Sequence, residues 1–222
     1  MRLHMKQDSK GFTIVELMIA TMVFSVVLLV ITFGVVYFTT SYYRGVNGST
    51  TQSTAQDALD TISQAVQFSG ISSVAPDASQ TFFCAGTKLF VYQLGVQYKG
   101  DPTATTGLYM LNKTGSNCAY QAPAANDGGT ELLGKNMRVL GFNMTKVTAG
   151  SGSSGDVWSL GLRIAYGDDD LLCSPTVGNC SNNNVLTTSQ FSNSDVICKV
   201  QAGSQFCTIA NLSTVAQQRV VN

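Results

Sequence analysis

A long run without charge, preceded by a single carboxylate, constrains this chain more than any other feature. Residues 17–43 contain no Asp, Glu, Lys or Arg, and as a helix they would extend about 40 Å at a rise of about 1.5 Å per residue. Because the hydrocarbon core of a bilayer is about 30 Å thick, this segment is long enough to span a membrane. Glu16 stands directly before the run, so its carboxylate lies at the edge of a membrane-grade helix and needs an explanation.

The charges before the run predict the orientation of the segment. Arg2, Lys6 and Lys10 outweigh Asp8, which favours a cytoplasmic N-terminus. A cleavable secretory signal would end its apolar region at a small-residue site, whereas this run ends in the aromatic and hydroxyl residues 37–43. We therefore expect a retained single-pass anchor in the cytoplasmic (inner) membrane, with the C-terminal part exported.

The junction before the helix resembles the processing site of the type IV prepilin family. The resemblance rests on the basic leader, on Gly11 at the cut, on the aromatic Phe12 and Thr13 after it, and on Glu16 as the fifth mature residue. It implies that a prepilin peptidase/N-methyltransferase removes residues 1–11 between Gly11 and Phe12 and methylates the amine of Phe12. It also implies assembly with other pilin subunits through the N-terminal helix, first from the inner membrane and then in a cell-surface pilus or a periplasmic pseudopilus.

The chain departs from the family at one point. Members often carry a helix-loosening proline about two-thirds of the way through the apolar segment, and this chain has Phe33 and Gly34 there. Local unwinding of the helix is therefore less predictable.

Elementary electrostatics supports a partner for Glu16. A carboxylate at the centre of a spanning helix costs about 2.5 to 3.5 kcal/mol, and less near an interface. Cleavage before Phe12 creates a positively charged amine, which methylation leaves charged. We hypothesise that Glu16 pairs with the amine of Phe12, within one subunit in the membrane and between neighbours in a filament, where unpaired charges penalise wrong registers. The competing interpretation is a plain single-pass anchor whose glutamate sits at the headgroup boundary.

The predicted fold is α+β and pilin-like. Residues 12–70 form one long helix, membrane-spanning over about 14–43 and amphipathic over 53–69, where Ala55, Leu59, Ile62 and Val66 recur at spacings of four, three and four. Residues 71–222 form an exported β-rich head, an antiparallel sheet that packs on the second half of the helix and is stabilised by disulfides.

Alternating apolar residues predict the strands of the head. The strongest signals are half-buried strands over 90–98 and 158–166, and a strand carrying Leu140, Phe142 and Met144, which the Gly/Ser-rich residues 149–155 join to the next strand as a hairpin. Weaker candidates are residues 80–84, 108–111, 195–200 and 216–221. The helix end over 59–70 and the strands around Phe142 and Trp158 most resemble W-type minor pilins and J-type pseudopilins.

Six cysteines all follow the apolar segment, which predicts disulfides on the exported side. Six cysteines allow 15 pairings, so sequence does not determine the connectivity. The pairs we favour are Cys84 with Cys118, Cys173 with Cys180, and Cys198 with Cys207. A zinc site is a poor alternative, because the only histidine is His4 in the leader and no C-x-x-C pair exists.

The rest of the sequence offers little for chemistry. Asp168, Asp169 and Asp170, with Asn179, could supply oxygen ligands to calcium, but a solvated turn is the simpler interpretation and the EF-hand spacing is absent. We expect no cofactor, no metal and no catalytic residue, because the exported part has no histidine, no G-x-S-x-G and no phosphate loop.

The charge balance gives no sign of nucleic-acid binding. The leader takes three of the thirteen basic residues and one of the thirteen acidic ones, so the mature chain is slightly acidic and lacks a broad basic footprint.

Two classes of function remain. The first is a structural filament subunit, most plausibly a minor pilin or pseudopilin that supports pilus biogenesis, adhesion, motility or secretion. The second is a binding protein, an adhesin or DNA-uptake receptor displayed on such a filament. A major pilin is a further alternative, although a head with three expected bridges is larger than a simple repeating subunit requires.

Overall fold

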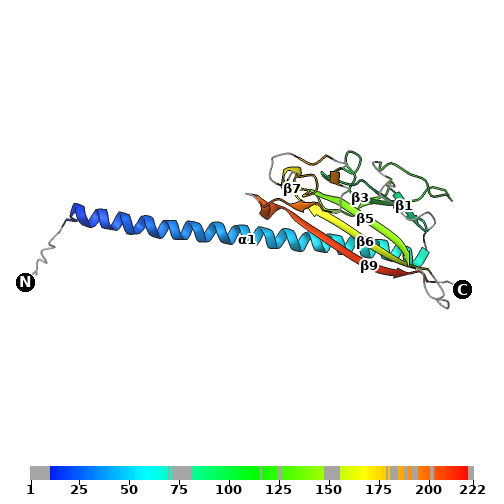
Figure 1. Ribbon diagram of the computed structural model, residues 1–222, viewed down its shortest axis with the longest axis horizontal. Coiled ribbons are helices and arrows are strands. Elements are labelled where there is room, and N and C mark those ends of the chain that lie inside the picture. Colours follow the sequence, from blue (N-terminus) through cyan, green and yellow to red (C-terminus); the bar gives the residue numbers. More distant parts are fainter. Residues whose placement is uncertain are drawn as a thin grey trace, which may run out of the picture. The chain divides into compact units, whose positions relative to one another are not determined.

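The chain divides into two compact units, residues 1–42 and residues 43–222. The computed structural model describes residues 11–69, 71, 82–115, 117–124, 127–147, 156–178, 180, 185–187, 190–191, 195–200 and 203–219. Helix α1 (Ile14–Ser69) contributes to both units, and all strands belong to the second (Figure 1). The expected class, a long apolar N-terminal helix with antiparallel sheets on its second half, is confirmed.

The second half of α1 turns one face toward the core of the head. Its buried residues are Thr51, Ala55, Ala58, Leu59, Ile62, Ser63 and Val66. All four apolar positions predicted from the spacing of four, three and four belong to this face. Ala55 and Ala58 are small, so they allow the sheet to approach the helix closely, while Leu59 and Ile62 each contribute about 1.5 to 3 kcal/mol by burial.

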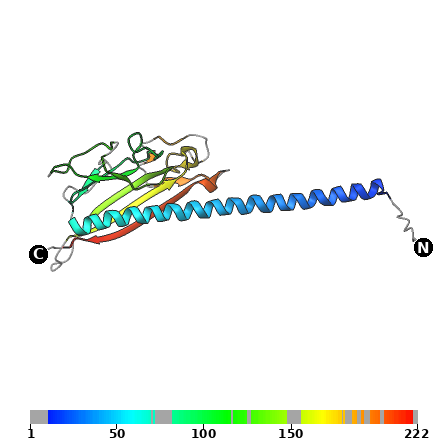
Figure 2. The same ribbon diagram turned by 180° about the vertical axis from the view of Figure 1, so that it is seen from behind.

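The larger strands form an antiparallel sheet that lies across this face of the helix. Its order is β5 (Met137–Val147), β6 (Val157–Tyr166) and β9 (Thr208–Gln217). β5 and β6 form the predicted hairpin, with Val147 opposite Val157, and the Gly/Ser-rich tip lies outside the described residues. Figure 2 shows α1 in front of the three strands, so the sheet covers one side of the helix.

A second antiparallel sheet completes the head. Its order is β1 (Phe82–Ala85), β2 (Lys88–Tyr92), β3 (Leu108–Asn112) and β4 (Thr130–Glu131). The β1–β2 turn passes beside the end of α1, where a Cβ on Gly86 would lie 2.0 Å from the Cβ of Ser69. Because Gly86 also has a φ of 60°, only glycine suits this turn.

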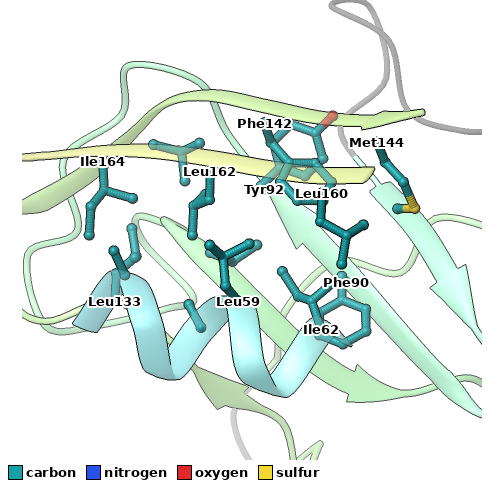
Figure 3. Close-up of a cluster of buried hydrophobic side chains, with 14 of the residues drawn as sticks. Leu59, Ile62, Phe90, Tyr92, Leu133, Phe142, Met144, Leu160, Leu162 and Ile164 are labelled. Atoms are coloured by element: carbon teal, nitrogen blue, oxygen red, sulfur yellow. The ribbon is translucent and has the colours of Figure 1, made fainter. Parts of the chain in front are cut away.

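Aromatic side chains join the two sheets in one core with the helix. Phe83 stacks on Phe90 at 4.8 Å between ring centroids and on Phe142 of the other sheet at 5.0 Å. Figure 3 shows Leu59 and Ile62 of α1 facing Phe90 and the inner residues of β6. The core therefore depends on the helix, whose apolar face it covers.

One predicted strand is wrong in extent and in burial. The strand expected over 90–98 ends at Tyr92, because Gly95 takes a φ of 75° and its N–H donates to the carbonyl of Val139. It is also not half-buried. Phe90 and Tyr92 enter the helix-facing core, while Leu89 and Val91 enter a second cluster on the other side of the sheet.

The β5 strand holds a further correction. Leu140, Phe142 and Met144 do not share a face, because the register shifts between Val139 and Gly141. This bulge sends Leu140 into a separate cluster with Leu172 and Phe191, while Phe142 and Met144 stay in the main core.

The weaker candidates fare unevenly. The strand over 108–111 is confirmed as β3, and β1 covers the described end of 80–84. The candidate at 195–200 shrinks to β8 (Ile197–Cys198), which pairs with β7 (Leu172–Cys173). The candidate at 216–221 is misplaced in its described part: β9 ends at Gln217, and residues 218 and 219 are not strand.

Three disulfides stabilise the head, Cys84–Cys118, Cys173–Cys180 and Cys198–Cys207. These are the pairs that the sequence analysis favoured. The second and third close short loops around β7, β8 and the short helix η3 (Ser204–Phe206), where the chain has little regular structure. Each bridge contributes about 2 to 4 kcal/mol.

A buried arginine ties the loops of the head together. The side chain of Arg138 is 1% exposed and pairs with Asp169, in the short helix η1 (Asp169–Leu171). Its Nη2 donates to the carbonyl of Gly167 at 2.8 Å, its Nη1 donates to the carbonyl of Gly95, and its guanidinium lies over the ring of Phe191. One cation therefore holds three loops against β5.

Replacing this arginine should destabilise the head strongly. Arg138→Met leaves two buried carbonyls without donors, at about 1 to 3 kcal/mol each, so we expect a loss of about 2 to 6 kcal/mol in the free energy of unfolding. The matched control is Lys146→Met, because Lys146 pairs with Asp156 at an exposed site and such pairs are worth about 1 kcal/mol or less. Urea unfolding of the full chain in detergent measures both, and equal effects would contradict the assigned role.

Candidate assembly site at the start of the N-terminal helix

Glu16 closes a capping box with Thr13 at the start of α1. The N–H of Thr13 donates to Oε2 of Glu16 at 3.0 Å, and the Thr13 hydroxyl donates to the same oxygen at 3.0 Å. In return the N–H of Glu16 donates to the Thr13 hydroxyl at 3.3 Å, and the N–H of Leu17 donates to the Thr13 carbonyl at 3.2 Å. These bonds satisfy backbone groups that the first turn of a helix otherwise leaves unpaired.

The role of Thr13 was missed at the level of sequence. Thr13 served only as part of the processing motif, although a threonine three residues before a glutamate and an apolar run is itself a capping signal. The structure adds a second reason for both residues, because they set the first turn of the helix as well as its charge.

The predicted cleavage residues lie directly before this cap. Gly11 and Phe12 precede the helix, and the side chain of Phe12 is 85% exposed. The Gly11–Phe12 peptide bond is intact in this chain, so the amine that would pair with Glu16 does not yet exist. The carboxylate of Glu16 accepts a hydrogen bond from the N–H of Thr13, the residue after Phe12. It therefore lies one residue along the chain from the nitrogen that cleavage would convert into an amine.

Five hydroxyl groups of the apolar segment are satisfied within the helix. Hydroxyls donate to carbonyls three or four residues earlier in the same helix, at 2.7 to 3.0 Å. The donors are Thr21, Ser25, Thr32, Thr39 and Thr40. A bilayer offers no water to pair such groups, so this internal pairing suits a helix surrounded by lipid or by other apolar helices.

The same segment exposes its apolar side chains around its whole circumference. Residues 11–39 are all exposed, among them Phe24, Leu29 and Phe38. Within the described part of the chain, α1 is the one helix long and apolar enough to cross a membrane. Together with the leader, this helix fits an inner-membrane anchor.

Two of the three aspartates considered as calcium ligands, Asp168 and Asp169, have local partners. Gln97 donates to Asp168, and Asp169 pairs with Arg138. In the described residues, no group of three or more His, Cys, Asp or Glu side chains could hold a metal ion, and Asn179 lies outside them. No observation in the described residues supports the calcium alternative.

Two other carboxylates stabilise loops of the head. Hydrogen bonds from the hydroxyls of Thr176 and Ser174 lower the pKa of Asp195 to about 2. Burial raises the pKa of the Glu131 carboxyl, although the backbone N–H groups of Leu108 and its neighbours donate to it. Both side chains therefore stabilise turns of the fold.

Comparison with known proteins bears on the N-terminal site. Residues 6–32 match the family model described as the prokaryotic N-terminal methylation motif. The chain carries this motif. The match includes the Gly11–Phe12 junction, the cap and about half of the apolar segment, and it supports a type IV pilin or pseudopilin subunit. No curated protein and no solved structure matches the chain.

The motif connects the geometry at the start of α1 with processing and assembly. It implies processing by a prepilin peptidase and assembly with other pilins, and it fits a subunit anchored in the inner membrane. Subunits of this kind generally have a structural, non-enzymatic role.

Removing the threonine of the cap should loosen the first turn of α1. Thr13→Val keeps the shape of the side chain but cannot bond to Glu16, and loss of an N-cap costs about 1 kcal/mol. We expect the amides of Glu16 and Leu17 to exchange hydrogen about fivefold faster in the full chain in detergent micelles. Thr21→Val is the control, because its hydroxyl only donates to the carbonyl of Met18. Unchanged exchange in Thr13→Val would show that the cap does not form.

Proposed function

We propose that this chain is a minor subunit of a type IV pilus or of a related secretion pseudopilus. Prepilin peptidase cuts it between Gly11 and Phe12, the new amine of Phe12 is methylated, and the subunit is stored in the inner membrane. It then joins a filament through its N-terminal helix. The methylation motif at residues 6–32 carries this proposal.

The arrangement at the helix start supports the assembly step. Glu16 is the one side-chain carboxylate between Phe12 and Asp57, and it accepts a hydrogen bond from the backbone N–H of Thr13, one residue after the Gly11–Phe12 junction. After cleavage, the amine of Phe12 supplies the opposite charge in the same place. In the membrane the pair neutralises itself, and in a filament the same charges pair between neighbouring subunits and set their axial stagger.

The head favours a minor role. It combines two antiparallel sheets with three disulfides and extended loops, which is more than a subunit that only repeats along a fibre needs. W-type minor pilins and J-type pseudopilins are the subgroups that we favour, on the helix end over 59–70 and on the hairpin of β5 and β6. In this role the subunit starts, caps or decorates the filament.

Quantitative mass spectrometry of filaments sheared from the native cell tests this proposal. We expect a chain that begins at methylated Phe12, at a small molar share of the total pilin. Phe12 as the dominant species would instead make this the major pilin. Absence from filaments, with the leader intact, would contradict the proposal and return the chain to a plain membrane anchor.

A strain that lacks the gene for this chain distinguishes a minor structural subunit from an adhesin or a DNA-uptake receptor. A minor subunit that starts or caps filaments is needed for their normal number, so its loss should reduce filament mass in the same preparation. Unchanged filament mass with lost surface attachment or DNA uptake would favour the binding alternatives.

A further inference from the structure

A pocket of the second unit lies beside Arg44, close to residue 43, where this unit begins. Its volume is about 350 Å³. The lining residues are Arg44, Cys198, Lys199, Val200, Ser204, Cys207, Thr208 and Ile209. Arg44 is also the first charged residue after the uncharged run of residues 17–43. The chain itself therefore places this pocket next to the end of the apolar segment.

Three contacts hold the short helix η3 against α1 and form one wall of the pocket. A guanidinium nitrogen of Arg44 donates to the Ser204 hydroxyl at 3.3 Å, and the Asn47 amide donates to the carbonyl of Gln205 at 3.0 Å. The rings of Tyr43 and Phe206 lie 5.4 Å apart. The Cys198–Cys207 disulfide cross-links two further lining residues of the pocket. These contacts and the disulfide therefore hold the lining residues in place.

The lining is cationic and rich in hydrogen-bond donors. Arg44 and Lys199 are its two charged residues, and Ser204 and Thr208 add hydroxyls. No carboxylate lines the pocket, and across the described ranges Arg44 forms no ion pair. Its bond to Ser204 uses one of five guanidinium donors, so a fork of N–H groups is left for an acceptor. Arginine forks of this kind suit phosphate oxygens.

Exposed apolar side chains stand beside these cations. Val200 is fully exposed, and Ile197 and Phe206 are each more than two-fifths exposed. Aromatic residues, including Tyr42 and Tyr43, end the apolar segment just before Arg44. Basic, aromatic and aliphatic side chains gathered at the end of a span are the composition of a membrane interface, where rings and aliphatic groups enter the headgroup region.

We propose that this pocket binds the phosphodiester headgroup of an anionic phospholipid in the leaflet that the anchor reaches. Arg44 is the principal contact, Ser204 orients its guanidinium, and Val200 and Phe206 rest on the glycerol and upper acyl region. Free phosphate shares the charge but offers nothing to the apolar side chains, so the lipid is the better occupant. The inference rests on the membrane span alone and not on assembly into a filament.

Native mass spectrometry of the full-length chain, released from nanodiscs made of equal parts phosphatidylcholine and phosphatidylglycerol, tests the proposal. We expect the wild type to retain phosphatidylglycerol in preference to phosphatidylcholine. Arg44→Gln should reduce this retention about fivefold, which is the worth of one basic contact near an anionic membrane surface. Ser204→Asp should act likewise, because its carboxylate would occupy the guanidinium from within the chain.

The matched control is Lys146→Gln, which also removes one cation from the head, but on β5 in an exposed pair with Asp156. It should retain lipid as the wild type does. Equal retention by Arg44→Gln and the wild type would overturn the proposal, as would equal retention of the two lipids. Displacement of the lipid by inorganic phosphate would overturn the lipid as occupant. Failure of the chain to co-elute with the discs would remove the membrane span as well, whereas co-elution without selective retention removes the pocket proposal alone.

Discussion

The carboxylate of Glu16 at the start of the apolar helix is the constraint on which the N-terminal part of this molecule depends. An apolar helix with a single carboxylate at its start has one costly group, and that group needs a partner at each stage. Before cleavage, the partner is the backbone and hydroxyl of Thr13, which close a capping box around the carboxylate. We propose that, after cleavage, the amine of Phe12 supplies a full opposite charge close to this position. In this proposal one side chain both starts the helix and provides the charge for pairing.

The head is organised by the second half of the same helix. Small and apolar residues along one face of α1 allow the β5–β6–β9 sheet to lie close, and aromatic rings join that sheet to the β1–β4 sheet. Away from this core the chain forms loops around β7, β8 and η3, where disulfides and the Arg138 side chain add to a smaller apolar cluster that includes Leu172 and Phe191. The head is thus held by apolar packing along α1 and is also cross-linked around β7, β8 and η3.

Much of this could be predicted from the sequence, because the governing signals are local. The uncharged run, the amphipathic spacing of Ala55, Leu59, Ile62 and Val66, and the alternation along β6 each reflect one element packed on one core. The errors arose where packing is not local. Residues 89–92 are buried on both sides by two different clusters, and the bulge before Gly141 moves Leu140 out of the face that simple alternation assigned.

The strand β9 shows why the last element was misplaced. Its inner face carries Ala210, Leu212, Thr214 and Ala216, which are mostly small or polar, while Ile209 and Val215 point to the other face. The alternation of apolar and polar residues therefore hardly predicts this strand, and it is defined by its pairing with β6. At the N-terminus the reverse holds, because the spacing of Thr13 and Glu16 already encodes the cap.

The most direct test of the central claim separates the charge of Glu16 from its cap. Glu16→Gln can still close the capping box, because glutamine accepts the same hydrogen bonds, but it cannot pair with the amine of Phe12. Glu16→Ala loses both. The measurement is the amount of each processed variant in sheared filaments relative to its amount in the membrane. If charge pairing drives assembly, both variants insert and are cleaved, and both are depleted from filaments by more than about tenfold, since an unpaired buried charge costs several kcal/mol. Incorporation of Glu16→Gln at the wild-type level would contradict this, and would leave Glu16 as a helix cap alone.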